Sequence, residues 1–104
     1  MSTYIITYDL NKPGQDYSSI LKKIKDLDYI MLSKSSYVVK TNLSASELWD
    51  RYFEPHVDKN DSFVILAASF PIAGRCDNSI SQWLNKNLDR ECAQRKGNLK
   101  IGPF

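Results

Sequence analysis

Four short blocks of apolar and β-branched residues predict a sheet of four strands. Residues 3–8, 29–32 and 37–40 are rich in the β-branched and aromatic side chains that favour strands. Residues 63–68 form a continuous apolar run, which predicts a well-buried fourth strand. Residues 33–36 have the serine-rich composition of a hairpin turn between the second and third strands.

Three helices are predicted where apolar residues recur at intervals of three and four. The first follows the turn at Pro13, and Asp16 can cap it. The second starts at the capping box formed by Ser44 and Glu47 and ends before Pro55. The apolar faces are Tyr17, Ile20, Leu21, Ile24 and Leu27 in the first, Ala45, Leu48, Trp49, Tyr52 and Phe53 in the second, and Ile80, Trp83, Leu84 and Leu88 in a third, which Asp77 or Asn78 can cap.

The order β-α-β-β-α-β, followed by a helix and a tail, predicts an α+β fold of the ferredoxin-like, or split βαβ, type. Two helices would cover one face of an antiparallel sheet and leave the other for solvent, a partner, the third helix or the tail. The 104 residues suffice for one domain. We assign residues 1–88 to this domain and residues 89–104 to a basic C-terminal tail, in which residues 98–101 can form an extra edge strand.

Composition indicates an ordinary globular protein, 42% hydrophobic and 25% charged. The net charge of +2 permits nucleic-acid contact but does not argue for it. The sequence has no secretory signal pattern and no apolar stretch of the roughly 20 residues that span a bilayer, so we expect a cytoplasmic protein with no membrane partner. Cys76 and Cys92 match no zinc spacing and are expected to be reduced thiols.

The first predicted strand runs directly into Asp9, and the topology gives this carboxylate specific neighbours. In the predicted sheet, the end of the first strand, the hairpin, the start of the fourth strand and the start of the first helix lie at one end. We therefore expect that end to gather Asp9, Lys34, Ser35, Ser36, His56, Asp58 and Asp61.

Two interpretations of these carboxylates are open. Magnesium is usually bound by one or two carboxylates together with water and substrate phosphate, which makes Asp9 a candidate metal ligand, with Asp61 and His56 as candidates for supporting contacts. Alternatively, Asp58 and Asp61 form a turn, and Asp9 ends a strand or caps a helix. A calcium loop of the EF-hand type is excluded at Asp58–Asp61, which lacks the required glycine and distal glutamate.

Two further features bear on nucleic-acid binding. Tyr4 and Tyr8 share one face of the first strand, where aromatic rings can stack bases, but the RNA-recognition signature is missing and core or dimer packing is favoured. The tail can track a phosphate backbone, form a solvated extension or add an edge strand. Its candidate phosphate-binding residues are Arg90, Arg95, Lys96 and Lys100.

Residues 8–17 (Tyr-Asp-Leu-Asn-Lys-Pro-Gly-Gln-Asp-Tyr) resemble the opening of a group of small bacterial and phage proteins labelled SinR-like. The resemblance covers roughly residues 4–88 and leaves the basic tail outside. It continues through Val39-Lys40-Thr41, Leu43-Ser44, the stretch from Asp50-Arg51 to Pro55-His56, Asp58-Lys59-Asn60-Asp61 and Trp83-Leu84-Asn85-Lys86.

That group is in turn similar to the CRISPR-associated ferredoxin-fold endonuclease of spacer acquisition and to VapD-type toxins, through the element order and the Tyr-Asp-Leu at the end of the first strand. In those nucleases an aspartate from each subunit of a homodimer is associated with one shared divalent metal. The resemblance implies Asp9 as the catalytic and metal-binding residue, with Mg²⁺ or Mn²⁺ as the ion. It also implies that residues 98–101 pair with the partner subunit.

The expected function is that of a nuclease-like, nucleic-acid-associated homodimer that cleaves phosphodiesters with metal-activated water. Two alternatives keep enzymatic activity an open question. One is a non-catalytic dimeric scaffold, adaptor or inhibitor that binds another protein. The other is a ligand-sensing dimer.

Overall fold

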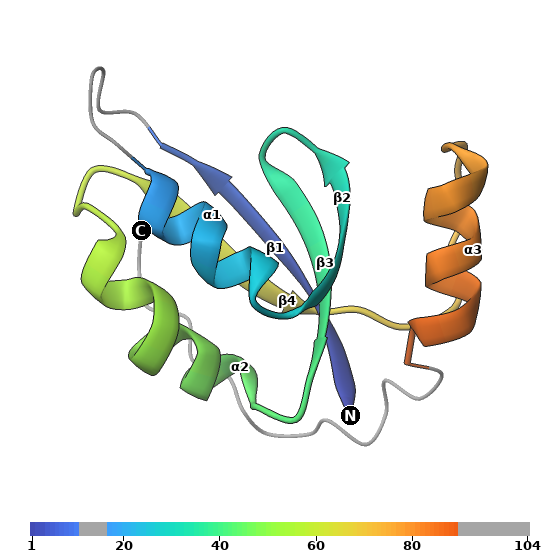
Figure 1. Ribbon diagram of the computed structural model, residues 1–104, viewed down its shortest axis with the longest axis horizontal. Helices are drawn as coiled ribbons and strands as arrows, with labels where there is room; N and C mark the ends of the chain where they lie inside the picture. Colours follow the sequence, from blue (N-terminus) through green and yellow to red (C-terminus); the bar gives the residue numbers. More distant parts are fainter. Residues whose placement is uncertain (11–16, 90–104) are drawn as a thin grey trace.

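A four-stranded antiparallel sheet forms the centre of the computed structural model, which describes residues 1–10 and 17–89 (Figure 1). The strands are β1 (Ser2–Asp9), β2 (Asp28–Ser33), β3 (Ser36–Thr41) and β4 (Ser62–Ala67), in the spatial order β2-β3-β1-β4. Together with three helices they make an α+β fold. All four predicted strands are confirmed, with each end within one residue of the expected position.

The helices α1 (Ser18–Lys25) and α2 (Ala45–Glu47) lie over one face of the sheet, as expected (Figure 1). At α2, the Glu47 N–H donates to Ser44 Oγ at 3.1 Å, and the Ser44 N–H donates to Glu47 Oε1 at 3.1 Å. This confirms the capping box. The hydrogen bond from the Ser44 backbone is the main reason why the pKa of Glu47 is lowered.

The second helix continues beyond α2 in conformations that the sequence pattern does not predict. A π-helical turn, η1 (Leu48–Phe53), is followed by a 3-10 turn, η2 (Glu54–His56), so helical structure extends past Pro55. Pro55 is tolerated because it lies at the start of η2, where no backbone N–H is needed. Leu48 and Phe53 are both fully buried and are five residues apart, which is the hydrogen-bonding interval of a π-helix.

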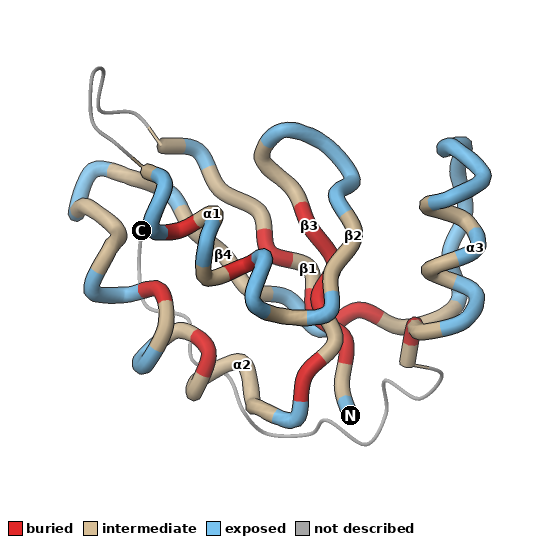
Figure 2. The backbone as a smooth tube through the Cα atoms, in the orientation of Figure 1, coloured by how far each residue is buried: buried red, intermediate tan, exposed pale blue. Residues whose placement is uncertain are grey.

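The main core lies between the sheet and these helices, and buried segments occur on both (Figure 2). Alternate residues of β1 and β3 point into it, because successive side chains of a strand face opposite sides. Its buried members are Tyr4, Ile6, Ile20, Ile24, Tyr37, Val39, Leu48 and Phe53.

A smaller cluster lies on the opposite face of the sheet. Helix α3 (Asn78–Asn87) packs there through Trp83 and Leu84, and Figure 2 shows no buried segment along α3 itself. The Thr3 hydroxyl contacts both ends of the segment that carries α3. It donates to the Ala68 carbonyl at 2.7 Å and accepts from the Asp89 N–H at 2.9 Å. Thr3 is therefore a buried polar anchor for the chain segments that precede and follow α3.

The prediction of a well-buried fourth strand is wrong. Strand β4 is the edge of the sheet and pairs, within the described residues, with β1 alone. None of its six residues is buried, and Leu66 is 43% exposed. A continuous apolar run is typical of a central strand, but strand order is decided by tertiary pairing, which composition does not encode.

Candidate functional site

The end of the sheet that carries Asp9 brings together the segments predicted to meet there. Asp9 is exposed, is the last residue of β1 and lies opposite Ser62, the first residue of β4. The Tyr8 N–H donates to the Ser35 carbonyl at 3.1 Å, and the Tyr8 hydroxyl donates to the Lys34 carbonyl at 3.2 Å. The prediction that Asp9, the hairpin and the turn before β4 share one end is confirmed.

The turn before β4 uses its carboxylates for its own structure. Asp61 Oδ2 accepts from the Asp58 N–H at 3.2 Å, and Asp58 Oδ1 accepts from the Asn60 N–H at 3.3 Å. Asp61 Oδ1 accepts from the Tyr17 hydroxyl at 3.3 Å, which fastens the start of α1 to the same end of the sheet. These contacts are those of a turn-forming aspartate pair, the second of the two interpretations.

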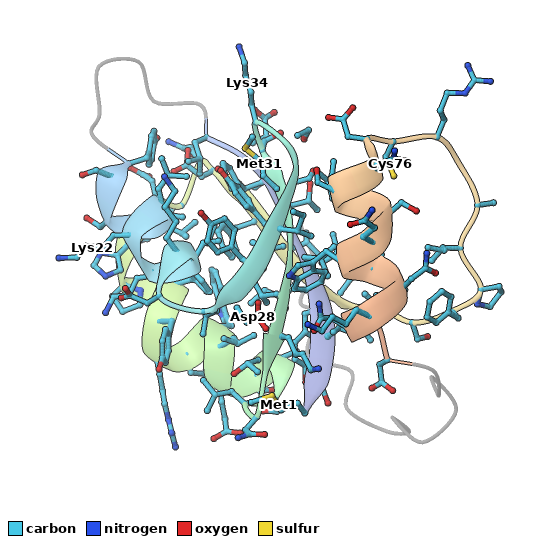
Figure 3. The ribbon with its side chains drawn as sticks, turned by 45° about the vertical axis from the view of Figure 1, so that its right-hand side comes forward. Met1, Lys22, Asp28, Met31, Lys34 and Cys76 are labelled. Carbon is cyan, nitrogen blue, oxygen red and sulfur yellow. The ribbon has the colours of Figure 1, made fainter. Side chains whose placement is uncertain are left out.

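Two other predicted neighbours of Asp9 are His56, which precedes the Asp58–Asp61 turn, and Lys34, which lies on the hairpin. His56 is half-buried at the end of η2, two residues before Asp58. Lys34 projects from the tip of the β2–β3 hairpin, far from Asp28 at the start of β2 (Figure 3). Within residues 1–10 and 17–89, no three His, Cys, Asp or Glu side chains are placed to hold a metal ion together.

The carboxylate of Asp9 itself has no hydrogen bond or ion pair to another described residue. Asp9 therefore differs from Asp61, whose two carboxylate oxygens both accept hydrogen bonds. A single exposed carboxylate can contribute one oxygen ligand to a divalent cation, and the remaining ligands would have to come from water, a phosphate or a second chain. Of Asp9, Asp58 and Asp61, Asp9 is the residue that fits the role of a single oxygen ligand.

Behind Asp9, the Tyr8 ring belongs to an aromatic stack rather than to an open platform. It stacks on Tyr37 at 6.4 Å between ring centroids and on Phe63 at 5.8 Å. Tyr4 is buried in the same core. Core packing, the favoured role for Tyr4 and Tyr8, is confirmed. Burial, with a smaller contribution from neighbouring Tyr37, raises the pKa of Tyr8 to about 12.

We predict that Tyr8 makes the protein sensitive to alkaline pH. Because its folded-state pKa exceeds the unfolded value of about 10, its contribution to stability is present below about pH 10 and is lost as the pH rises towards 12. The free energy of unfolding should fall across that interval in urea titrations. Tyr8→Phe, which keeps the ring and removes the ionisable hydroxyl, should reduce the fall. Parallel losses in both proteins would assign the sensitivity to other groups.

The last turn of α1 carries three lysines, Lys22, Lys23 and Lys25. Lys22 and Lys25 are exposed, as expected for a solvated face, and Lys23 Nζ lies 5.6 Å from the centroid of the Tyr52 ring. The predicted phosphate-binding residues Arg90, Arg95, Lys96 and Lys100 lie outside the described residues, as do Cys92 and the candidate strand 98–101. Cys76 is an exposed free thiol.

Comparisons with protein-family models, with curated proteins and with solved structures return no match. None of the described helices is long and apolar enough to cross a membrane. A function for this chain is therefore inferred from its residues and their placement.

Two features of the structure have no signal in the sequence pattern. The anchoring role of Thr3 is one, because a lone threonine in a strand is ordinary. The exposure of β4 is the other, because its uncharged sequence is unusual for a sheet edge.

Proposed function

We propose that this chain is a ferredoxin-like, nuclease-like protein that associates with nucleic acid as a homodimer, with Asp9 as a ligand for Mg²⁺ or Mn²⁺. The element order β1-α1-β2-β3-α2-β4 and the strand order β2-β3-β1-β4 support the ferredoxin-like assignment. The observation that carries the functional part is the exposed Asp9 carboxylate at the end of a central strand. The resemblance to SinR-like proteins and to CRISPR-associated nucleases supports the choice of reaction.

The residues present fit a metal ion whose coordination shell is completed by the substrate. Asp9 would supply one carboxylate, and phosphate oxygens of the nucleic acid together with water would complete the coordination. A bound ion of this kind lowers the pKa of its water and offsets the negative charge of the phosphate. The residues of this chain would hold and orient the ion. The hydrogen bonds from Tyr8 to the hairpin fix the end of β1 from which Asp9 projects.

Cleavage and binding assays with Asp9→Asn test this proposal. The wild-type chain should cleave labelled DNA or RNA in the presence of Mg²⁺ or Mn²⁺ and not in EDTA, and Asp9→Asn should lower the rate by about 100-fold or more. Asp28→Asn is the matched control, because Asp28 is also exposed but lies at the start of β2, at the other end of the sheet. Its rate should equal that of the wild type.

Two results would overturn the proposal in different ways. Absence of cleavage by the wild-type chain on single- and double-stranded DNA and RNA would reject a nuclease. Equal metal-dependent binding of nucleic acid by wild type and Asp9→Asn would reject Asp9 as the ligand. A steep loss of affinity with rising salt would still identify a nucleic-acid-binding protein.

A non-catalytic scaffold or adaptor is the second candidate, and the exposed edge of β4 favours it. An uncharged edge strand is a ready template for pairing with a strand from another chain. On this alternative Asp9→Asn would leave partner binding unchanged.

A further inference from the structure

The two edges of the sheet differ in how well they are protected against pairing with another strand. Strand β2, at one edge, begins with the exposed Asp28 and has an irregular register between Met31 and Ser33. Charge and a bulge are two devices that keep edge strands from associating. Strand β4, at the other edge, reads Ser-Phe-Val-Ile-Leu-Ala and has neither charge, proline nor register shift.

The register of β4 shows which of its backbone groups point outward. The Ala68 N–H donates to the Thr3 carbonyl at 3.0 Å, so Thr3 and Ala68 are a hydrogen-bonded pair of the antiparallel ladder. Hydrogen-bonded pairs alternate along such a ladder, so Val64 and Leu66 direct their backbone groups towards β1. The N–H and C=O groups of Phe63, Ile65 and Ala67 therefore point away from β1, and no described strand pairs with them on this side.

We propose that two copies of this chain join through their β4 edges in antiparallel pairing around a twofold axis at Ile65. In this register Phe63 of each copy lies opposite Ala67 of the other, and Val64 lies opposite Leu66. The outward backbone groups of Phe63, Ile65 and Ala67 then meet their equivalents and complete a ladder. A continuous eight-stranded sheet results.

A second copy is the occupant that best matches this edge, because the edge is complementary to itself. The strand has no charged side chain, so the twofold axis brings no like charges together. The large ring of Phe63 meets the small side chain of Ala67. Val64 of one copy would cover Leu66 of the other, whose side chain is exposed in the single chain.

This dimer has a consequence for Asp9, although its evidence is independent of the role of Asp9. Asp9 lies beside the start of β4, opposite Ser62. In antiparallel pairing the starts of the two β4 strands are at opposite ends of the joint sheet. The two Asp9 carboxylates are then far apart, and each would bind an ion alone instead of sharing one.

Sedimentation measurements of oligomeric mass test whether β4 forms the dimer interface. The wild-type chain of 11.9 kDa should sediment as a dimer. Leu66→Lys should weaken dimerisation by about tenfold or more, because it adds a charge at the interface. Ala67→Pro should do the same, because it removes an outward N–H and no bond to β1. Leu32→Lys, an exposed apolar residue on the β2 edge, is the matched control and should remain dimeric. Circular dichroism checks that each variant folds.

Cross-linking tests the register in a background where Cys76 and Cys92 are replaced by serine. Val64→Cys combined with Leu66→Cys should form a covalent dimer rapidly on oxidation, since non-hydrogen-bonded antiparallel pairs have Cα atoms about 4.5 Å apart. Leu66→Cys alone should not, because its opposite residue is Val64. A monomeric wild type, a dimer insensitive to Leu66→Lys and Ala67→Pro, or equal cross-linking of the single and double variants would overturn the proposal.

Discussion

Phe53→Ala is expected to lower the free energy of unfolding by about 3–5 kcal/mol. Phe53 is fully buried, and its ring lies 5.0 Å from the Phe63 ring and 6.3 Å from the Tyr52 ring, measured between centroids. Alanine would remove this apolar contact and leave a cavity at the junction of η1, α1 and β4. Since small domains have total stabilities of about 5–15 kcal/mol, the loss is a large fraction of the whole.

Urea unfolding followed by circular dichroism measures this loss. Phe53→Leu is the matched control: it keeps an apolar side chain at the site and should cost clearly less. A loss below about 1 kcal/mol for Phe53→Ala would mean that the site collapses around the smaller side chain, and that the packing of η1 against the sheet is not as described.

Thr3→Val is expected to destabilise the fold by about 1–3 kcal/mol, although valine has nearly the same shape and a high strand propensity. Thr3 is 1% exposed, and its hydroxyl donates to the Ala68 carbonyl while it accepts from the Asp89 N–H. Valine would leave the Asp89 N–H without this acceptor. In Thr3→Val, the rate of amide hydrogen exchange should rise above the wild-type rate more in the segment from Ala68 to Asp89 than in the main core.

Two substitutions make the Thr3 prediction specific. Thr3→Ser keeps the hydroxyl and should retain most of the stability. Thr7→Val removes a half-buried hydroxyl of the same strand, which lies 3.2 Å from Ser36 Oγ, and should cost less than Thr3→Val. Equal stability of wild type and Thr3→Val would contradict the anchoring role.

Much of the local structure follows from the sequence because local patterns decide it. The strands follow from β-branched runs, the start of the second helix from the pair Ser44 and Glu47, and the face of α3 from Trp83 and Leu84. The gathering of Asp9, the hairpin and the Asp58–Asp61 turn also follows, because the antiparallel directions of the strands fix which ends coincide.

The parts that could not be predicted depend on contacts between distant residues. Leu48 and Phe53 were both assigned to the apolar face, but only packing against the sheet reveals that a π-helical turn buries them together. The run 63–68 has the composition of a central strand and forms an edge, because its neighbour is chosen by the whole fold. The use of Asp61 within its own turn was one of two open interpretations, and its hydrogen bonds favour that one.

Paramagnetic broadening by Mn²⁺ tests most directly whether Asp9 is a metal ligand. In spectra of the ¹⁵N-labelled chain, low concentrations of Mn²⁺ should first broaden the amide resonances around Asp9, Ser35 and Ser62, which lie together at this end of the sheet. The same pattern should appear in Asp28→Asn and should disappear in Asp9→Asn. Unchanged broadening in Asp9→Asn, or broadening centred on another part of the chain, would contradict the assignment of Asp9 as the metal ligand.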